Sequence, residues 1–336
     1  MKLGEGVKAK NKKVLMRACN ACESVRISSL SLRKCVSVRR DARVRRRVAR
    51  QKRETLVVRS RVSMEKSPCF FRLLPHLSSP YSSSSMQILL SPAKQMQCVA
   101  AVTSPSQSIP RFQSEALDIA TQLSRRSGEE LAALLHTTPR IGARAALDYA
   151  ALLTHPTTAP AVLTYAGMAY RHLRAETFDA AEMDYAQGHL WITSFLYGLN
   201  RPLDGIASYR LEGGAPAPDG EQSIFDYWKS RLTDVLIDSV RADDGVLLYL
   251  ASGEMKRLFD WTRVTREVRV VAPEFRVMKG EQLKIVVVYA KMMRGAMARY
   301  ALTRRLSTPE DLLDFEYEGF AHLPDAKIPY LWVCGA

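Results

Sequence analysis

Two arginines and two carboxylates stand close together in one short segment of the chain. Arg201 is followed by Pro202 and Asp204, and Arg210 is followed by Glu212. Proline stiffens the backbone directly after Arg201, so the two guanidinium groups could be held in directions that clamp a phosphate between them. The same residues could instead pair with one another and tie a loop to the core. Their spacing leaves both interpretations open.

A second group of cations lies on the last predicted helix, residues 290–306. At about 100° per residue, Lys291 and Arg294 fall on one face, and several methionines gather on the opposite face. Gly295 lies near the basic face and costs the helix about 1 kcal/mol relative to alanine. That cost is easier to understand if another group approaches the backbone there. The basic face either contacts phosphate or is an ordinary solvated face.

Further polar residues lie at the ends of predicted elements, where binding pockets are usually built. They are Lys94, Glu176, Asp204, Ser252 and Glu254, together with Arg201, Arg210 and Lys291. A lysine beside carboxylates could serve in acid–base or covalent chemistry if burial lowered its pKa. If Lys94, Ser252 and Lys291 meet in one closed cavity, a small-molecule or nucleotide-handling enzyme is favoured. Cations along an open groove wide enough for a duplex would favour DNA binding instead.

Several common kinds of chemistry have no signature in the chain. It contains no Gly-x-x-x-x-Gly-Lys-Ser/Thr loop, no Gly-x-Gly-x-x-Gly and no Gly-x-Ser-x-Gly, which argues against common ATP, NAD and serine-hydrolase chemistry. Cys19 and Cys22 have the spacing of a metal-binding pair, but no second Cys or His pair completes four ligands. We therefore expect no metal and no cofactor. No run of 18 apolar residues occurs, so we also expect no transmembrane helix.

The positive charge of the chain is concentrated in residues 1–85. This part holds 22 Lys and Arg against 5 Asp and Glu, whereas residues 86–336 hold 27 against 29. Because the first part is rich in Arg and Ser and poor in aromatic residues, we expect a disordered basic extension. Three interpretations stay open: a transit peptide, a basic nucleic-acid-binding arm, and a coding start placed too far upstream of Met86. Any DNA binding by the nearly neutral domain, residues 86–336, must rest on a local cluster of cations.

The elements that must position these residues alternate between helical and extended patterns. Helical patterns cover residues 113–126, 129–136, 140–153, 179–190, 224–241 and 290–306. Extended patterns cover residues 86–90, 161–166, 246–250, 267–272, 274–278 and 283–289. Helices dominate the first half and closely spaced strands the second. We therefore predict a single mixed α+β domain whose central, barrel-like strands are surrounded by helices.

Six blocks of this domain follow one another in a recognisable order. They are Leu90–Lys94, Ala175–Phe178, Leu196–Asp204, Tyr209–Glu212, Leu250–Glu254 and Tyr289–Arg299. In order and spacing these blocks resemble the YaaA family of bacterial peroxide-stress proteins, from Met86 to about Phe320. The resemblance implies a cytoplasmic protein with an unusual mixed α/β fold, and we expect a monomer.

The resemblance also implies that the protein binds duplex DNA without sequence preference and limits iron-driven DNA damage under hydrogen peroxide. Binding would use a basic cleft and a helix-hairpin-helix-like element, which we place at residues 194–198 with its turn at Gly198. Phe195 stands where such a turn would have glycine, and Met168 and Met255 replace an aspartate and a tyrosine of the family. The cations assigned to the cleft are Lys94, Arg201, Arg210, Lys291, Arg294 and Arg299.

The alternative function is that of a small-molecule or nucleotide-handling enzyme. Its pocket would combine the lysines and arginines with Glu176, Asp204, Ser252 and Glu254. The sequence leaves the question of catalysis open, and a non-catalytic role is what the family resemblance favours.

Overall fold

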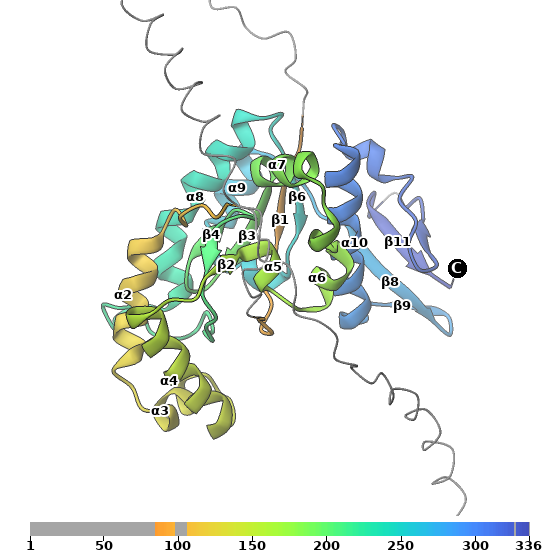
Figure 1. Ribbon diagram of the computed structural model, residues 1–336. Helices are drawn as coiled ribbons and strands as arrows, with labels where there is room; N and C mark the ends of the chain where they lie inside the picture. Colours follow the sequence, from red (N-terminus) through yellow and green to blue (C-terminus); the bar gives the residue numbers. More distant parts are fainter. Residues whose placement is uncertain (1–84, 98–105, 326, 336) are drawn as a thin grey trace, which may run out of the picture. The chain divides into compact units, whose positions relative to one another are not determined.

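A mainly parallel five-stranded sheet lies at the centre of the fold (Figure 1). Its strand order is β4–β3–β1–β6–β7, and only the β3–β4 pair is antiparallel. The strands are β1 (Gln87–Leu90), β3 (Leu190–Ser194), β4 (Gly198–Asn200), β6 (Val246–Leu250) and β7 (Arg269–Val271). The predicted mixed α/β fold class is therefore confirmed.

The computed structural model describes residues 85–97, 106–325 and 327–335, which all belong to one compact unit. The predicted basic extension, with Cys19 and Cys22, lies outside the described residues apart from Ser85. The helices are α2 (Gln113–Ser124), α3 (Gly128–Leu134), α4 (Pro139–Thr154), α5 (Ala161–Thr164), α6 (Met168–Leu173), α7 (Ala180–His189), α8 (Ile224–Ala242), α9 (Trp261–Glu267) and α10 (Val287–Arg304). Short 3-10 helices are η1 (Ala175–Thr177), η2 (Gly253–Leu258) and η3 (Pro309–Leu312).

Two smaller sheets accompany the central one. The strands β10 (Phe320–His322), β11 (Leu331–Cys334), β8 (Glu274–Lys279) and β9 (Gln282–Lys284) form a four-stranded sheet in that order. The strands β2 (Ala159–Pro160) and β5 (Gly205–Ile206) pair antiparallel.

Strand β1 is the middle of the central sheet and is buried along its whole length. Leu89 lies opposite Trp191 of β3 on one side and opposite Tyr249 of β6 on the other, both in parallel register. Strands buried on both faces read as continuous apolar runs, as the segments QILL and VLLYL do. The chain thus leaves β1 toward one side, passes through β3 and β4, and returns to the other side as β6. The carboxyl ends of β1, β3 and β6 meet at one edge of the sheet.

Helix α8 packs against this sheet through a buried apolar face that includes Trp228, Leu232 and Leu236. Ser223 caps its first turn by accepting a hydrogen bond from the Asp226 backbone. The indole of Trp228 donates a hydrogen bond of 2.8 Å to the carbonyl of Phe195. Trp228 therefore holds the turn that follows β3.

The placement of a helix-hairpin-helix at residues 194–198 is wrong, because this segment is the turn of a β-hairpin. Ser194 of β3 pairs with Gly198 of β4, and Gly198 has a φ of 68°. A β-carbon at Gly198 would lie 2.9 Å from a ring carbon of Trp228. Glycine is required here by the left-handed backbone and by the packing of α8 rather than by contact with phosphate.

Two predicted extended segments are also wrong in part. Residues 161–166 begin as the helical turn α5, and helix α6 follows where no helix is predicted. The predicted strand 283–289 ends at Lys284, because its apolar residues from Val287 onward begin α10. Short apolar runs fit a strand and a helix equally well, and tertiary contacts decide between them.

Helices α6 and α10 pack against each other at Gly295. An ideal β-carbon at Gly295 would lie 1.8 Å from the carbonyl oxygen of Ala169 on α6. The group that approaches the Gly295 backbone is therefore a neighbouring helix. This close approach sets the position of α6 relative to the basic residues of α10.

Replacing Gly295 with alanine will destabilise the protein by about 1–3 kcal/mol, because α6 must move to relieve a clash with its backbone. The matched control is Gly188→Ala near the end of α7, where nothing lies within 4 Å of the new β-carbon. This control will be neutral or stabilising by about 0.5–1 kcal/mol. Urea denaturation measures both changes; equal stability of the two variants would contradict the packing described.

The opposite, amino edge of the central sheet is held together by Arg201. Its guanidinium donates hydrogen bonds to Gln87 Oε1 (3.1 Å), the Leu190 carbonyl (3.3 Å) and Ser239 Oγ (3.2 Å). It also lies over the ring of Trp191, 3.4 Å from the centroid. Burial lowers the pKa of Arg201 to about 10, so the group keeps its charge at neutral pH. Arg201 therefore links β1, β3 and α8.

Arg201→Lys will cost about 1–3 kcal/mol of stability, because lysine lacks the planar fork and leaves buried acceptors unpaired. Arg144→Lys is the control, since Arg144 makes only a surface ion pair with Asp148 one helical turn away and its replacement will cost under about 0.5 kcal/mol. The comparison is made by thermal and urea unfolding. A loss at Arg201 no larger than at Arg144 would refute this role.

Candidate functional site

A cavity of about 570 Å³ lies at the carboxyl ends of β1, β3 and β6. Its lining includes Ser91 and Lys94 after β1, Phe195 after β3, and Ser252 after β6. In open sheets with parallel strands, ligands bind outside the carboxyl ends of the strands where the chain's path reverses. Strand β1 has this property, because its two neighbours are reached in opposite directions. The cavity therefore lies where the topology favours a binding site.

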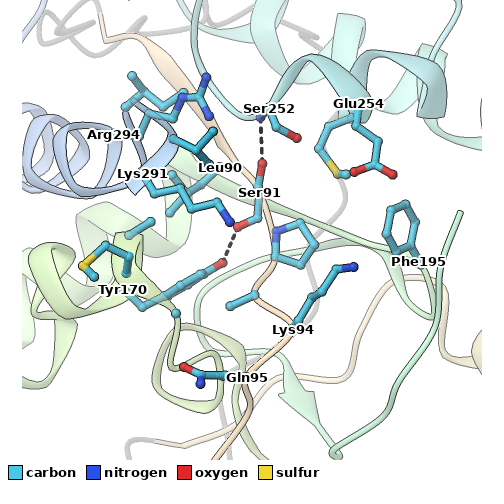
Figure 2. A pocket seen from close by; sticks show the side chains of 18 of the residues that line it. Leu90, Ser91, Lys94, Gln95, Tyr170, Phe195, Ser252, Glu254, Lys291 and Arg294 are labelled. Carbon is cyan, nitrogen blue, oxygen red and sulfur yellow. Dashed lines mark hydrogen bonds between the residues drawn. The ribbon is translucent and has the colours of Figure 1, made fainter. Parts of the chain in front are cut away.

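Hydrogen bonds fix the segment that leaves β1. The backbone N–H of Ser252 donates to Ser91 Oγ at 2.8 Å, and the hydroxyl of Tyr170 donates to the Ser91 carbonyl at 2.9 Å (Figure 2). Thr193 Oγ1 donates to the Leu90 carbonyl at 3.2 Å. The floor of the cavity is thus tied to β3, to α6 and to the segment after β6.

Lys291 and Arg294 line the cavity from α10, one helical turn apart. Within the described residues, neither side chain makes a hydrogen bond or has a carboxylate within 4 Å. Burial lowers the pKa of Arg294, and the hydroxyl of Tyr249 partly opposes this shift. Two neighbouring cations without a counter-charge have the chemistry to hold an anion.

Lys94 and Arg210 line another part of the cavity and share one carboxylate oxygen. Lys94 Nζ lies 2.9 Å and Arg210 Nη2 lies 2.7 Å from Glu212 Oε1. Lys94 is largely exposed, whereas Arg210 and Glu212 are mostly shielded from solvent. The buried Nε of Arg210 has no hydrogen-bond partner. This cluster keeps a net positive charge and one unused donor.

The side of the cavity across from the α10 cations has a different character. Figure 2 shows Glu254 and Phe195 together on this side, with Ser91 and Ser252 between them and the two cations. Phe195 is buried and packs edge-on against Phe225 with ring centroids 5.5 Å apart. Glu254 is exposed and has no hydrogen bond or ion pair within the described ranges. The α10 cations therefore lie on one side of the cavity, and Glu254 lies beside an aromatic ring on the other side, toward which Figure 2 also shows the amino group of Lys94 directed.

Six of the predicted site residues meet in this cavity: Lys94, Arg210, Ser252, Glu254, Lys291 and Arg294. The others lie elsewhere. Asp204 is buried near Arg201, where it accepts hydrogen bonds from Ser108 Oγ (2.7 Å) and the Arg201 backbone (2.8 Å). Burial raises the pKa of its carboxyl. Glu176 is exposed on η1 and does not line the cavity.

Arg299 is the remaining predicted cation, and it closes the carboxyl end of α6. Its Nη1 donates to the carbonyls of Leu173 (3.1 Å) and Arg174 (3.0 Å) and to Thr177 Oγ1 (2.8 Å). Free carbonyls at the end of a helix favour such a cation. Like Arg201, Arg299 is bonded to internal acceptors and does not line the cavity.

Sequence reasoning missed the residues that α6 contributes. Tyr170 and Arg171 line the cavity beside Met168, and Tyr209 lines it from the segment before Arg210. Tyr209 is buried and bonds to Ser194 Oγ at 2.7 Å. The short helix α6 has no strong periodic pattern, so the sequence carries no signal that would place it over the cavity. Tyr209 belongs to the block Tyr209–Glu212, which resembles the YaaA family, and this resemblance is the sequence signal that could have identified it.

Two further observations concern metals and membranes. Across the described residues, no group of three or more His, Cys, Asp or Glu side chains is arranged to hold a metal ion. None of the described helices combines the length and apolar character needed to cross a membrane.

Known proteins resemble this chain over the whole of the region that forms the site. Residues 86–326 match the family described as "Peroxide stress protein YaaA". A protein of Bacteroides thetaiotaomicron named "UPF0246 protein" is 48% identical over 237 residues, which is 70% of this chain and 92% of the relative. A "UPF0246 protein" of Tolumonas auensis is 36% identical over 246 residues, covering 71% and 94% of the two chains. The chain belongs to the YaaA family of peroxide-stress proteins.

Proposed function

We propose that this peroxide-stress protein binds a phosphate-bearing ligand of nucleotide size in the cavity at the carboxyl edge of the central sheet. The observation that carries the proposal is the pair Lys291 and Arg294, which faces the cavity without a counter-charge in the described structure. Cavities of about 300–1,000 Å³ suit small ligands, and this one has about 570 Å³.

The polar groups around the cavity support a phosphate rather than a simple carboxylate. Lys291 and Arg294 supply charge, and the Nε of Arg210 supplies an unused buried donor. The hydroxyl of Ser91 accepts one hydrogen bond from Ser252 and keeps its own proton to donate. Charged and neutral donors along the cavity suit the several oxygens of a phosphate group.

The double variant Lys291→Ala/Arg294→Ala will bind pyrophosphate and dCMP at least about tenfold more weakly than the unaltered protein, because two charge-assisted contacts are lost. Its affinity will also depend less on salt. The control is Arg144→Ala/Lys229→Ala, which removes the same charge from two surface ion pairs outside the cavity and will leave affinity within about twofold.

Isothermal titration calorimetry of the full chain at two salt concentrations measures these affinities, and circular dichroism checks that each variant is folded. Equal affinities of the cavity variant and the control variant would refute the proposal.

A second candidate function, duplex DNA binding, is favoured by the helical hairpin α3–α4. The two helices are joined by residues 135–138 and pack so closely that a β-carbon at Gly142 would lie 2.1 Å from the Gly128 carbonyl oxygen. Thr138 caps α4, and Arg140 is exposed in its first turn. Amides at a helix N-terminus next to a cation can contact a phosphate without reading bases. We infer that a helix-hairpin-helix-like role belongs here rather than at residues 194–198.

This hairpin is connected to the cavity. The hydroxyl of Tyr149 on α4 donates a hydrogen bond of 2.6 Å to the carbonyl of Arg210. This hydrogen bond thus joins the helical hairpin that would contact DNA to the segment that lines the cavity. The YaaA family match supports the further proposal that the ligand serves the protection of DNA from iron-driven damage during peroxide stress.

Arg140→Ala will weaken duplex DNA binding about three- to tenfold and make the salt dependence shallower, because contacts with phosphates are lost. Binding of dCMP in the cavity will not change. Arg144→Ala is the control, since Arg144 on the same helix is already paired with Asp148. Fluorescence anisotropy with a labelled duplex of random sequence gives the affinities. Loss of duplex binding in the Lys291/Arg294 variant but not in the hairpin variant would contradict the placement of duplex binding at α3–α4, and no duplex binding by the unaltered protein would contradict the function itself.

A further inference from the structure

The two sides of the cavity carry different chemical groups, and these select a ligand with more features than a phosphate group. Lys291 and Arg294 on α10 form a cationic end, and Glu254 on η2 lies across the cavity beside Phe195 (Figure 2). Ser91 and Ser252 lie between the two ends. A ligand that satisfies both ends must carry an anion on one side and a hydrogen-bond donor on the other.

The walls between these ends are apolar and suit a flat ring. Phe195 and Met255 are buried with 6% and 3% of their surfaces exposed, and both line the cavity. Met168 from α6 lines it too. Aromatic rings and methionine side chains pack well on the faces of planar groups.

Glu254 has no cationic partner within the described parts of the chain, although five cations, Lys94, Arg171, Arg210, Lys291 and Arg294, line the same cavity. An ionised carboxylate only accepts hydrogen bonds. It would therefore bind an amino group on a ring and would be repelled by a ring carbonyl in the same position. This distinction separates cytosine from uracil and adenine from hypoxanthine.

We propose that the cavity recognises a single nucleotide whose base carries an exocyclic amino group, with its phosphate at Lys291 and Arg294 and its amino group at Glu254. This inference rests on the proposed function and names the ligand class of the same site. The ligand chemistry is shared by a free mononucleotide and by one unstacked nucleotide of a DNA strand, since both present the same phosphate and the same base edge.

The test compares dCMP with dUMP, which differ in the amino or carbonyl group at one ring position. Calorimetry with the full chain will show dCMP binding about tenfold or more tightly than dUMP, because a site built to accept a hydrogen bond rejects the analogue that cannot donate it. In Glu254→Gln the preference will fall below about threefold, because a side-chain amide can rotate to pair with either group. Glu221→Gln removes an exposed carboxylate outside the cavity and will keep the full preference.

The outcomes separate this inference from the proposed function. Equal binding of dCMP and dUMP by the unaltered protein, with both weakened in Lys291→Ala/Arg294→Ala, overturns base recognition and leaves phosphate binding intact. No binding of pyrophosphate or of either nucleotide overturns both.

A final arm identifies the source of the nucleotide. If an oligonucleotide of six deoxycytidines binds more tightly than dCMP and depends on Glu254 in the same way, the cavity takes a nucleotide of a DNA strand. If dCMP binds more tightly, it takes a free nucleotide. In either case recognition of the amino group requires that the deoxycytidine ligand bind more tightly than its deoxyuridine counterpart and that this preference fall in Glu254→Gln. An oligonucleotide of deoxyuridines that binds as tightly as its deoxycytidine counterpart would contradict it.

Discussion

The parallel pairing of β1 with β3 on one side and β6 on the other is the constraint on which the rest of the structure depends. It brings three carboxyl ends to one edge of the sheet and leaves the space outside β1 for a cavity. A residue that follows each of these strands lines the cavity: Ser91 after β1, Phe195 after β3 and Ser252 after β6. Arg201 ties the strands together at the opposite edge, so the arginine that is most conspicuous in the sequence stabilises the framework instead of lining the site.

The cationic side of the cavity depends on a second constraint, the contact between α6 and α10. Gly295 allows the two helices to touch through backbone atoms, and Arg299 bonds to the carbonyl groups at the end of α6. These two residues of α10 hold α6 in place, while Lys291 and Arg294 of the same helix face the cavity. One face of α10 thus packs against α6, and another face places two positive charges at the cavity. Among the described residues, Lys291 and Arg294 have no counter-charge and also line the cavity, whereas other arginines such as Arg263 and Arg269 have acidic partners.

The sequence predicted many of the residues that line the cavity, but not the elements that bring them together. The long helices were visible as periodic patterns, and the positions of Lys94, Ser252 and Lys291 at the ends of predicted elements marked them as residues that could converge. Sequence alone could not separate Arg201 from Arg210, because both stand in the same turn-rich segment with a carboxylate nearby. The structure separates them, because Arg201 bonds to β1, β3 and α8 whereas Arg210 lines the cavity. Helix α6 was missed because a helix of six residues carries almost no periodic signal. Residues 194–198 were wrongly predicted to form a helix-hairpin-helix, because the sequence of a turn that contains glycine does not show whether strands or helices flank it.

The central claim is that Lys291 and Arg294, which have no counter-charge among the described residues, bind phosphate in the cavity at the carboxyl edge of the central sheet. Hydrogen–deuterium exchange of the full chain with and without pyrophosphate tests it most directly, because the ligand slows exchange where it is bound. The account predicts protection of the segments 91–97 and 285–294, which flank the cavity, and no change in residues 128–142. Protection confined to residues 128–142, or no protection at saturating pyrophosphate, would contradict it.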